Sequence, residues 1–307
     1  MKIDTFTINC VFTSDATVSF YKGSALRGAF GHALKKTCCA LRYNKCSDCM
    51  LTASCAYSLI FESKKLNQNK THYRIRLSSK PNPYVLEPPL DSRCNYKAGD
   101  SFSFTLKLFG PALNYRPQII YALILMGKTG LGKQNRGVFR IKSISSNNQV
   151  IYDEDTNSLS MQDTSQELFL ASEHDSCTSL TVDFLTPFRI KRNNVFQSEI
   201  TFGTLIRAAM RRVSSLEEAY GKGEPDIDYR GLAQLADSIE TVEDKTSWHD
   251  IPRYSSRQKT PMKLGGVQGS IMFKGDIAQF LPLLRYCEVM HIGKSTTFGL
   301  GMMRLEQ

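Results

Sequence analysis

The stretch IIYALILMGKTGLGKQNRGVFRI, residues 119–141, passes from apolar residues at helical spacing, through a glycine-rich turn, to a strand-like alternation. The same order recurs near the other end of the chain in IAQFLPLLRYCEVMHIGKSTTFGLGMMRL, residues 277–305. Both stretches contain Gly-Leu-Gly, at 130–132 and at 299–301. This shared order of helix, glycine turn and strand predicts two copies of one structural unit.

The first stretch also matches most of a nucleotide-binding P-loop, G-x-x-x-x-G-K-[ST]. Gly127, Gly132 and Lys133 fit, but Gln134 stands where a Ser or Thr hydroxyl would bind Mg²⁺. A P-loop follows a strand and opens a helix, and here the predicted order is reversed. We therefore interpret the stretch as a glycine turn that lets the backbone approach a phosphate chain closely, and not as an NTPase loop.

The beginnings of the two halves are alike as well. TFTINCVF at 5–12 and LTVDFLTPFRI at 180–190 alternate as strands do. Helical patterns follow in GSALRGAFGHALKKTCCAL, 23–41, and SEITFGTLIRAAMRRVSSLEEAY, 198–220. Together with the two ends, these patterns predict an α+β fold built from two β-α-β-β-α-β units.

An acidic segment separates the two halves. DEDTNSLSMQDTSQELFLASEHDSCTS, 153–179, is rich in Ser, Thr and Asp and predicts a linker or long surface loop. The expected domains are therefore 1–152, with a cysteine-containing insertion at about 38–57, and 180–307.

The charge is distributed unevenly along the chain. The net charge is +10, yet residues 1–150 alone hold 22 Lys and Arg against 7 Asp and Glu. A folded region with this excess repels itself unless an anion offsets it, and nucleic acid is the usual partner. A solvated basic surface with no nucleic-acid partner is the alternative.

No feature of the sequence indicates a membrane or secreted protein. No apolar run reaches the ~18 residues that a membrane span requires. MKIDTFTINCVF at the N-terminus alternates like a strand and lacks the pattern of a signal peptide. We therefore expect the protein in the cytoplasm.

Five of the nine cysteines lie within residues 38–55. The spacing C-x6-C-x2-C-x5-C suits tetrahedral thiolate ligation of zinc. Four protein ligands leave no open coordination position, so such a zinc would be structural and would take no part in catalysis. An iron–sulfur cluster and unligated thiols are the alternatives, and Cys38 could replace the first ligand. The predicted metal ligands are Cys39, Cys46, Cys49 and Cys55.

His32 is the leading candidate for a catalytic residue. It shares a face of the predicted helix 23–41 with Lys35 and Lys36. An imidazole beside cations suits RNA cleavage by the RNA's own 2′-hydroxyl, because His can move the proton and Lys can neutralise the phosphorane. Tyr21 precedes the helix and could fold back near it. A helix histidine with a purely structural hydrogen bond is the alternative interpretation.

His291 is the second candidate, because it stands at the start of the second glycine turn with Lys294 nearby. It is a phosphate contact, a competing base or a plain turn residue. Basic side chains that cluster around both turns and both helices are expected to contact RNA, with solvated surface as the alternative. These residues are Arg27, Lys36, Lys128, Lys133, Arg136, Arg189, Lys191, Arg192, Arg211, Arg212, Arg253 and Arg257.

With these residues in place, the chain resembles the CRISPR-associated endoribonucleases that process precursor crRNA, the Cas-six group of the RAMP superfamily. The resemblance extends over nearly the whole chain, in the expected order. It is carried by GSALRGAFGHAL (23–34), the cysteine run through CAYSLIFE (55–62), NPYVLEPP (82–89), GKTGLGKQNRGVFRI (127–141), TPFRIKRNN (186–194), RAAMRR (207–212), RYSSRQ (253–258), MKLGGVQG (262–269) and HIGKSTTFGLG (291–301). The cysteine run resembles a branch of the group with a cysteine cluster after the first helix.

The resemblance implies two tandem ferredoxin-like domains that bind CRISPR repeat RNA. It also implies metal-independent cleavage of precursor crRNA, in which 2′-hydroxyl attack leaves a 2′,3′-cyclic phosphate and a 5′-hydroxyl. The general base of that group is commonly a His at or near the first helix, which corresponds to His32, with Lys35 and Tyr21 as candidate assistants. A non-cleaving RNA-binding subunit of a CRISPR effector complex is the alternative function.

Overall fold

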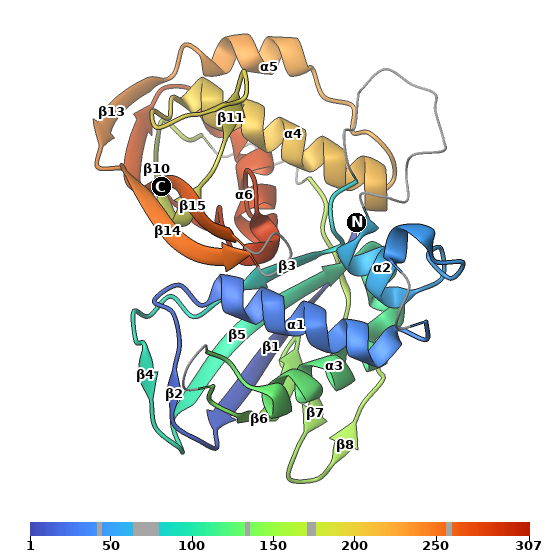
Figure 1. Cartoon of the computed structure of the whole chain (residues 1–307). Helices are drawn as coiled ribbons and strands as arrows, with labels where there is room; N and C mark the ends of the chain where they lie inside the picture. The colour runs from blue at the N-terminus through green and yellow to red at the C-terminus, as the bar shows by residue number, and fades with distance from the viewer. Residues whose placement is uncertain (42–44, 64–79, 133–135, 171–175, 256–259) are drawn as a thin grey trace. The chain divides into compact units, whose positions relative to one another are not determined.

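The chain divides into two compact units. The first is Met1–Glu167 with Ala219–Gly221, and the second is Leu168–Glu218 with Lys222–Gln307. The computed structural model describes residues 1–41, 45–63, 80–132, 136–170, 176–255 and 260–307. Each unit is described by itself below (Figure 1).

The first unit is a sheet covered by helices. Its elements in chain order are β1 (Lys2–Phe12), β2 (Ala16–Thr17), α1 (Gly23–Cys38), α2 (Ala56–Phe61), β3 (Tyr84–Glu87), β4 (Asn95–Tyr96), β5 (Ser101–Phe109), α3 (Arg116–Thr129), β6 (Phe139–Ser146), β7 (Gln149–Asp153), β8 (Ser158–Leu159) and β9 (Gln166–Glu167). The sheet order is β3-β5-β1-β6-β7-β8, and β9 pairs with β1. The strand pairs are antiparallel, with Thr7 of β1 opposite both Thr105 of β5 and Ser145 of β6.

Alternation along β1 explains which face of this sheet the helices cover. Phe6, Ile8 and Phe12 are buried, whereas Thr7 and Asn9 between them are exposed. α1 and α3 lie side by side across the buried face (Figure 1), and their apolar residues join β1 in one core. Side chains of a strand alternate between faces, so the apolar face needs a cover and the hydroxyl face does not.

The second unit repeats this plan. Its elements are β10 (Ser179–Phe188), β11 (Lys191–Arg192), β12 (Val195–Phe196), α4 (Phe202–Tyr220), α5 (Tyr229–Ala236), β13 (Glu240–Asp244), β14 (Ser247–Ser255), β15 (Thr260–Lys274), α6 (Leu281–Met290) and β16 (Met303–Glu306). The sheet order is β13-β15-β10-β16, and β14 pairs with β15.

The two sheets share one topology. In β3-β5-β1-β6 and in β13-β15-β10-β16, the strands of the repeat lie in the order second, third, first, fourth. A helix connects the first strand to the second in each unit, and another connects the third to the fourth. This is the ferredoxin-like β-α-β-β-α-β arrangement, so the prediction of two tandem α+β domains is confirmed.

The acidic segment at 153–179 differs from the linker that we expected. Its first part belongs to the sheet of the first unit, where β8 pairs with β7 and β9 pairs with β1. Asp163 holds it there by accepting hydrogen bonds from Ser165 and Arg116. Strands of two residues are too short to produce a readable alternation, which explains why the sequence pattern resembled a loop.

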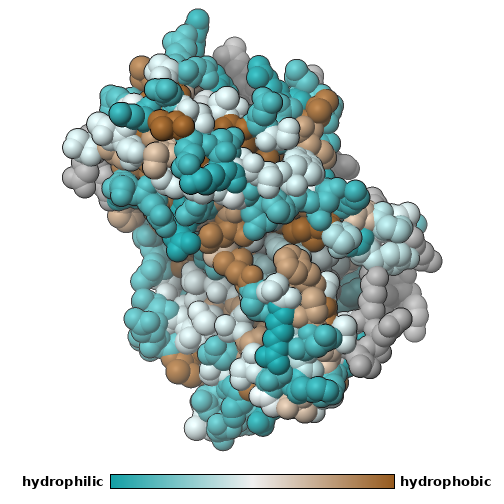
Figure 2. Space-filling view, turned by 90° about the vertical axis from the view of Figure 1, so that its left-hand side faces the viewer, coloured by the Kyte–Doolittle hydropathy of each residue, from teal (hydrophilic) through white to brown (hydrophobic). Residues whose placement is uncertain are grey.

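The surface shown in Figure 2 is mainly hydrophilic, with hydrophobic residues in small separate groups. Within the described part of the chain, no helix has both the length and the apolar composition needed to cross a membrane.

Candidate active site and nucleic-acid interface

His32 is exposed on α1. The same helix buries Leu26, Phe30 and Leu34 against the sheet, so His32 lies on the opposite, solvent-facing stripe. Lys36 is exposed one turn later on that stripe. One turn earlier stands Gly28, where an added Cβ would meet no atom within 4 Å. A helical side chain leans toward the preceding turn, so this glycine leaves the imidazole open to an approaching chain.

Short helix α2 fixes the neighbouring cations of α1. The ammonium of Lys35 lies 5.7 Å from the centre of the Tyr57 ring, and the guanidinium of Arg27 lies 5.0 Å from that of Phe61. Both cations are therefore partly covered by aromatic rings, while Lys36 is exposed. The structure thus places the imidazole of His32 and the ammonium of Lys36 on one exposed stripe of α1, with Lys35 turned toward α2.

Tyr21 and Lys22 lie at the start of α1. Burial raises the pKa of the Tyr21 phenol, which keeps it protonated and makes it a hydrogen-bond donor rather than a base. Lys22 is buried, and its ammonium donates to the backbone oxygen and the carboxylate of Asp91 at 2.9 and 3.1 Å. Sequence reasoning missed Asp91, because nothing local marks a partner 69 residues away.

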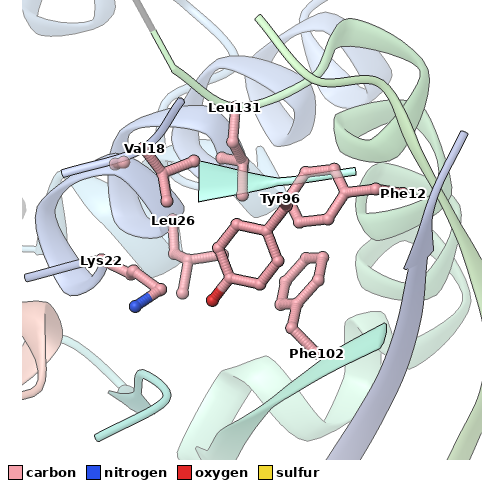
Figure 3. A pocket seen from close by; sticks show the side chains of 8 residues that line it. Phe12, Val18, Lys22, Leu26, Tyr96, Phe102 and Leu131 are labelled. Atoms are coloured by element: carbon pink, nitrogen blue, oxygen red, sulfur yellow. The ribbon is translucent and has the colours of Figure 1, made fainter. Parts of the chain in front are cut away.

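A small apolar cavity adjoins Lys22 (Figure 3). Phe12, Tyr96 and Phe102 form its aromatic wall, and Leu131 of the first glycine turn closes it. Its volume is about 10 Å³, which is room for about one water molecule. The cavity is therefore too small for a nucleotide, and Lys22 with Asp91 anchors the entry to the helix.

The first glycine turn is a closed backbone loop. α3 ends at Gly130 with φ 78°, and Leu131 and Gly137 exchange backbone hydrogen bonds of 2.9 and 2.8 Å. Lys128 and Arg136 are exposed at its two sides, and the predicted RNA contact Lys133 lies outside the described residues. A helix precedes the turn and a strand follows it, which is the reverse of a P-loop.

The second glycine turn contains a buried histidine. His291 has no exposed surface, and its Nδ1 lies 3.2 Å from the backbone oxygen of Leu300. Its backbone has φ 57°, and its carbonyl accepts a hydrogen bond from Arg212. The sequence offered His291 as an alternative catalytic base. The structure contradicts this prediction, because a buried ring that is hydrogen-bonded to the turn cannot contact a substrate.

Arg212 likewise differs from the expected RNA contact. Its guanidinium donates to the backbone oxygens of Met290 and His291 and to the hydroxyl of Thr296. Orphan carbonyls at a helix C-terminus need such donors, so this arginine stabilises the end of α6 and the turn after it. Arg211 beside it is exposed on α4.

Three of the remaining basic candidates of the second unit lie against aromatic rings. The guanidinium of Arg189 lies 3.9 Å from the centre of the Phe196 ring, and the ammonium of Lys191 lies 4.5 Å from it. Arg253 lies 4.6 Å from the centre of the Phe298 ring in the second glycine turn. Arg192 is exposed, and Arg257 lies outside the described residues. Sequence reasoning counted the cations and missed Phe196, although an aromatic residue inside a basic stretch was a usable signal.

Each of the two units matches a known protein-family model. Residues 1–164 match the family model of an N-terminal domain, and residues 182–303 match that of the CRISPR-associated endoribonuclease Cas6. The second unit therefore carries the domain of the CRISPR-associated endoribonuclease Cas6, and the chain is a Cas6-type protein.

Proteins similar to this Cas6-type chain match nearly all of its length. An uncharacterized protein of Archaeoglobus fulgidus is 27% identical over 292 residues, which cover 93% of this chain and 91% of that protein. The structure of a Cas6 product complex is similar with a TM-score of 0.53 at 14% identity, covering 100% of both chains. Thermus thermophilus Cas6 is similar with a TM-score of 0.55 at 10% identity, covering 99% of this chain and 98% of that chain. At sequence identities of 10% and 14%, the structural similarity shows a shared fold and nothing more.

The cysteines of this Cas6-type protein form no disulfide bond among the described residues. Cys39, Cys46, Cys49 and Cys55 are free and partly exposed. Burial raises the pKa of Cys38 to about 11, and the Cys55 and Cys39 thiols act in the same direction. Among the residues that the structure describes, no three His, Cys, Asp or Glu side chains are grouped closely enough to hold a metal ion. The zinc site expected from the cysteine spacing stays a prediction.

Proposed function

We propose that this Cas6-type protein cleaves precursor CRISPR RNA within its repeat without a catalytic metal ion. The observation that carries the proposal is the exposed imidazole of His32 among cations on the first helix of a ferredoxin-like unit. His32 accepts the proton of a ribose 2′-hydroxyl, whose oxygen then bonds to the adjacent phosphorus. The bond from phosphorus to the 5′-oxygen breaks and this oxygen takes up a proton from solvent, which leaves a 2′,3′-cyclic phosphate and a 5′-hydroxyl.

Neighbouring groups are assigned by their charge and protonation. Lys35 and Lys36 offset the charge that develops on the phosphorane. Tyr21 remains protonated because burial raises its pKa, so its proposed role is that of a supporting hydrogen-bond donor at the start of α1 and not that of a base. His291 takes no part in the proposed reaction, because its ring is buried in the turn.

Repeat RNA is the proposed partner, bound in the cytoplasm by exposed and aromatic-supported cations of both units. A CRISPR effector complex is a second proposed partner. The described residues proposed to contact RNA are Arg27, Lys36, Lys128, Arg136, Arg189, Lys191, Arg192, Arg211 and Arg253. The structure of a Cas6 product complex, similar in fold, supports this proposal for the family.

Cleavage by the wild-type protein tests the proposed reaction. In excess EDTA, the purified protein should convert a repeat RNA to two fragments at the rate seen without EDTA. End analysis should find a 2′,3′-cyclic phosphate and a 5′-hydroxyl, and a 2′-deoxy substitution at the cleaved nucleotide should block the reaction because the nucleophile is missing. Tight binding of intact RNA without any cleavage would instead establish the non-cleaving RNA-binding subunit.

We further propose a structural zinc held by Cys39, Cys46, Cys49 and Cys55, on the spacing of these residues. A structural zinc contributes folding free energy, so Cys49→Ser should lower the unfolding temperature of the first unit by several degrees and leave the RNA cleavage rate of the folded protein unchanged. Cys94→Ser is the matched control, because Cys94 lies outside the cluster. Metal analysis of protein kept reduced should find one zinc per chain; iron would indicate a cluster, and no metal would refute the site.

A further inference from the structure

The chain has a single tryptophan, and it lies on the surface of the second unit. Trp248 belongs to β14 and is 39% exposed. Its Nε1 donates to the carboxylate of Asp250 at 3.1 Å, so the ring's one polar atom already has a partner within the protein. The exposed part of the indole is therefore carbon surface, which gains nothing from contact with water.

The indole is held in a fixed position. A Cβ added to Gly265 of β15 would lie only 2.5 Å from the indole Cζ2, so the ring rests against the backbone of this glycine. The ring of Phe196 lies beside it, with centroids 6.3 Å apart and planes at 55°. Together Trp248 and Phe196 form what we call the aromatic platform.

Fixed cations border the aromatic platform. Arg189 donates from Nη1 to the backbone oxygens of Lys263 and Gly265, each at 3.2 Å, while its guanidinium covers the Phe196 ring. Lys191 covers the same ring, and Arg192 beside it is exposed. The exposed carbon surface of the indole next to several cations matches the two parts of a nucleotide, its base and its phosphate.

The aromatic platform continues into the second glycine turn. The backbone nitrogen of Lys294 donates to the backbone oxygen of Arg189 at 2.8 Å. Gly293 leaves room for this contact, because a Cβ there would lie 2.7 Å from the same oxygen at a φ of 81°. A strand of RNA that follows the turn would therefore reach the platform without leaving the second unit.

We propose that the aromatic platform stacks an unpaired nucleobase of the bound RNA, with Lys191 and Arg192 on the adjoining phosphates. This inference rests on the proposed function and adds a base-stacking subsite to it. Every base has a π-face, so the subsite would accept single-stranded RNA of many sequences. The surrounding positive charge favours RNA over a protein partner as the occupant.

Fluorescence of the wild-type protein provides the direct test. With one tryptophan, any change in emission reports Trp248 alone. Titration with an adenosine decamer, rA10, should quench the emission in a saturable way, because a base stacked on an indole quenches it. A decamer of abasic ribose phosphates should bind more weakly and leave the emission unchanged.

Variants separate stacking from folding. Trp248→Ala should weaken rA10 binding about tenfold, as expected for one lost stack, and Trp248→Phe should restore most of that loss. Leu235→Ala on α5 removes another exposed apolar side chain, 48% exposed, and should leave binding unchanged. Circular dichroism should show that all three variants are folded.

The outcomes distinguish this inference from the proposed function. If repeat RNA binds with unchanged tryptophan emission and Trp248→Ala binds rA10 as well as the wild type does, the stacking subsite is refuted and the proposed nuclease is not. Such a result would leave the platform as a surface for a protein partner. If the wild type neither binds nor cleaves repeat RNA, the proposed function itself has failed.

Discussion

We expect His32→Ala to slow cleavage of repeat RNA by between about 100-fold and about 10,000-fold. The same substitution should change the affinity for the RNA by no more than about twofold. The loss is that of a general base, whose contribution commonly falls in this range. Affinity survives because the exposed imidazole supplies one contact, whereas many phosphate contacts from other residues hold the RNA. Single-turnover cleavage and a filter-binding titration of each protein measure the two quantities.

The matched control is His249→Ala. His249 is also exposed, but it lies on β14 in the second unit with its ring near the hydroxyl of Ser247. Its loss should change neither rate nor affinity. Added imidazole should partly restore the rate of His32→Ala, because the open stripe above Gly28 admits a small base. A full rate in His32→Ala would remove this residue from the mechanism.

The fold was predictable because its determinants are local. The alternating patterns at residues 5–12 and 180–190 predict two strands, which the structure shows as β1 and β10. The two helix–glycine–strand stretches predict two helices, which the structure shows as α3 and α6. The paired hairpin of β14 and β15 was not predicted. Most residues of β14 are exposed, and in β15 the glycines Gly265, Gly266 and Gly269 interrupt the apolar pattern on which such predictions depend.

The site was only partly predictable, because exposure and long-range pairing decide it. The face of His32 followed from helical spacing, since Leu26, Phe30 and Leu34 mark the buried side. The burial of His291 did not follow, because its surroundings come from Leu300 and from α4. The burial of a side chain depends on segments that are far apart in the sequence, and a local sequence pattern does not indicate which segments these are.

The partners of the basic side chains were likewise not predictable from the sequence. Arg207 and Arg211 lie four residues apart on α4 and therefore share one face of that helix. Yet Arg207 pairs with Asp237, whereas Arg212 serves the carbonyls of α6. The number of basic residues predicts a basic surface. Only the distances from each basic side chain to carboxylates and carbonyls of the protein show which of them pair within the protein and which can contact a phosphate.

Gly301→Ala should produce the largest loss of stability among simple substitutions in the second glycine turn. Gly301 has φ 70°, and an added Cβ would overlap the backbone oxygen of Ile292. The same glycine closes the turn, because its oxygen accepts from the backbone nitrogen of Ile292 at 2.9 Å and its own nitrogen donates to Pro187 at 3.1 Å. The methyl group therefore cannot be accommodated unless these hydrogen bonds open.

Strain and overlap together should lower the free energy of unfolding of the second unit by about 3 kcal/mol, in the range expected for a strained backbone with a forced contact. Gly223→Ala is the matched control, since Gly223 also has a positive φ, 111°, but an added Cβ there meets nothing within 4 Å. It should lose only about 1 kcal/mol, the lower end of backbone strain alone. Urea unfolding followed by Trp248 emission measures both variants in the unit that contains them. Equal losses would mean that the turn moves aside for the methyl group, and the close approach of Gly301 to Ile292 would then contribute nothing to stability.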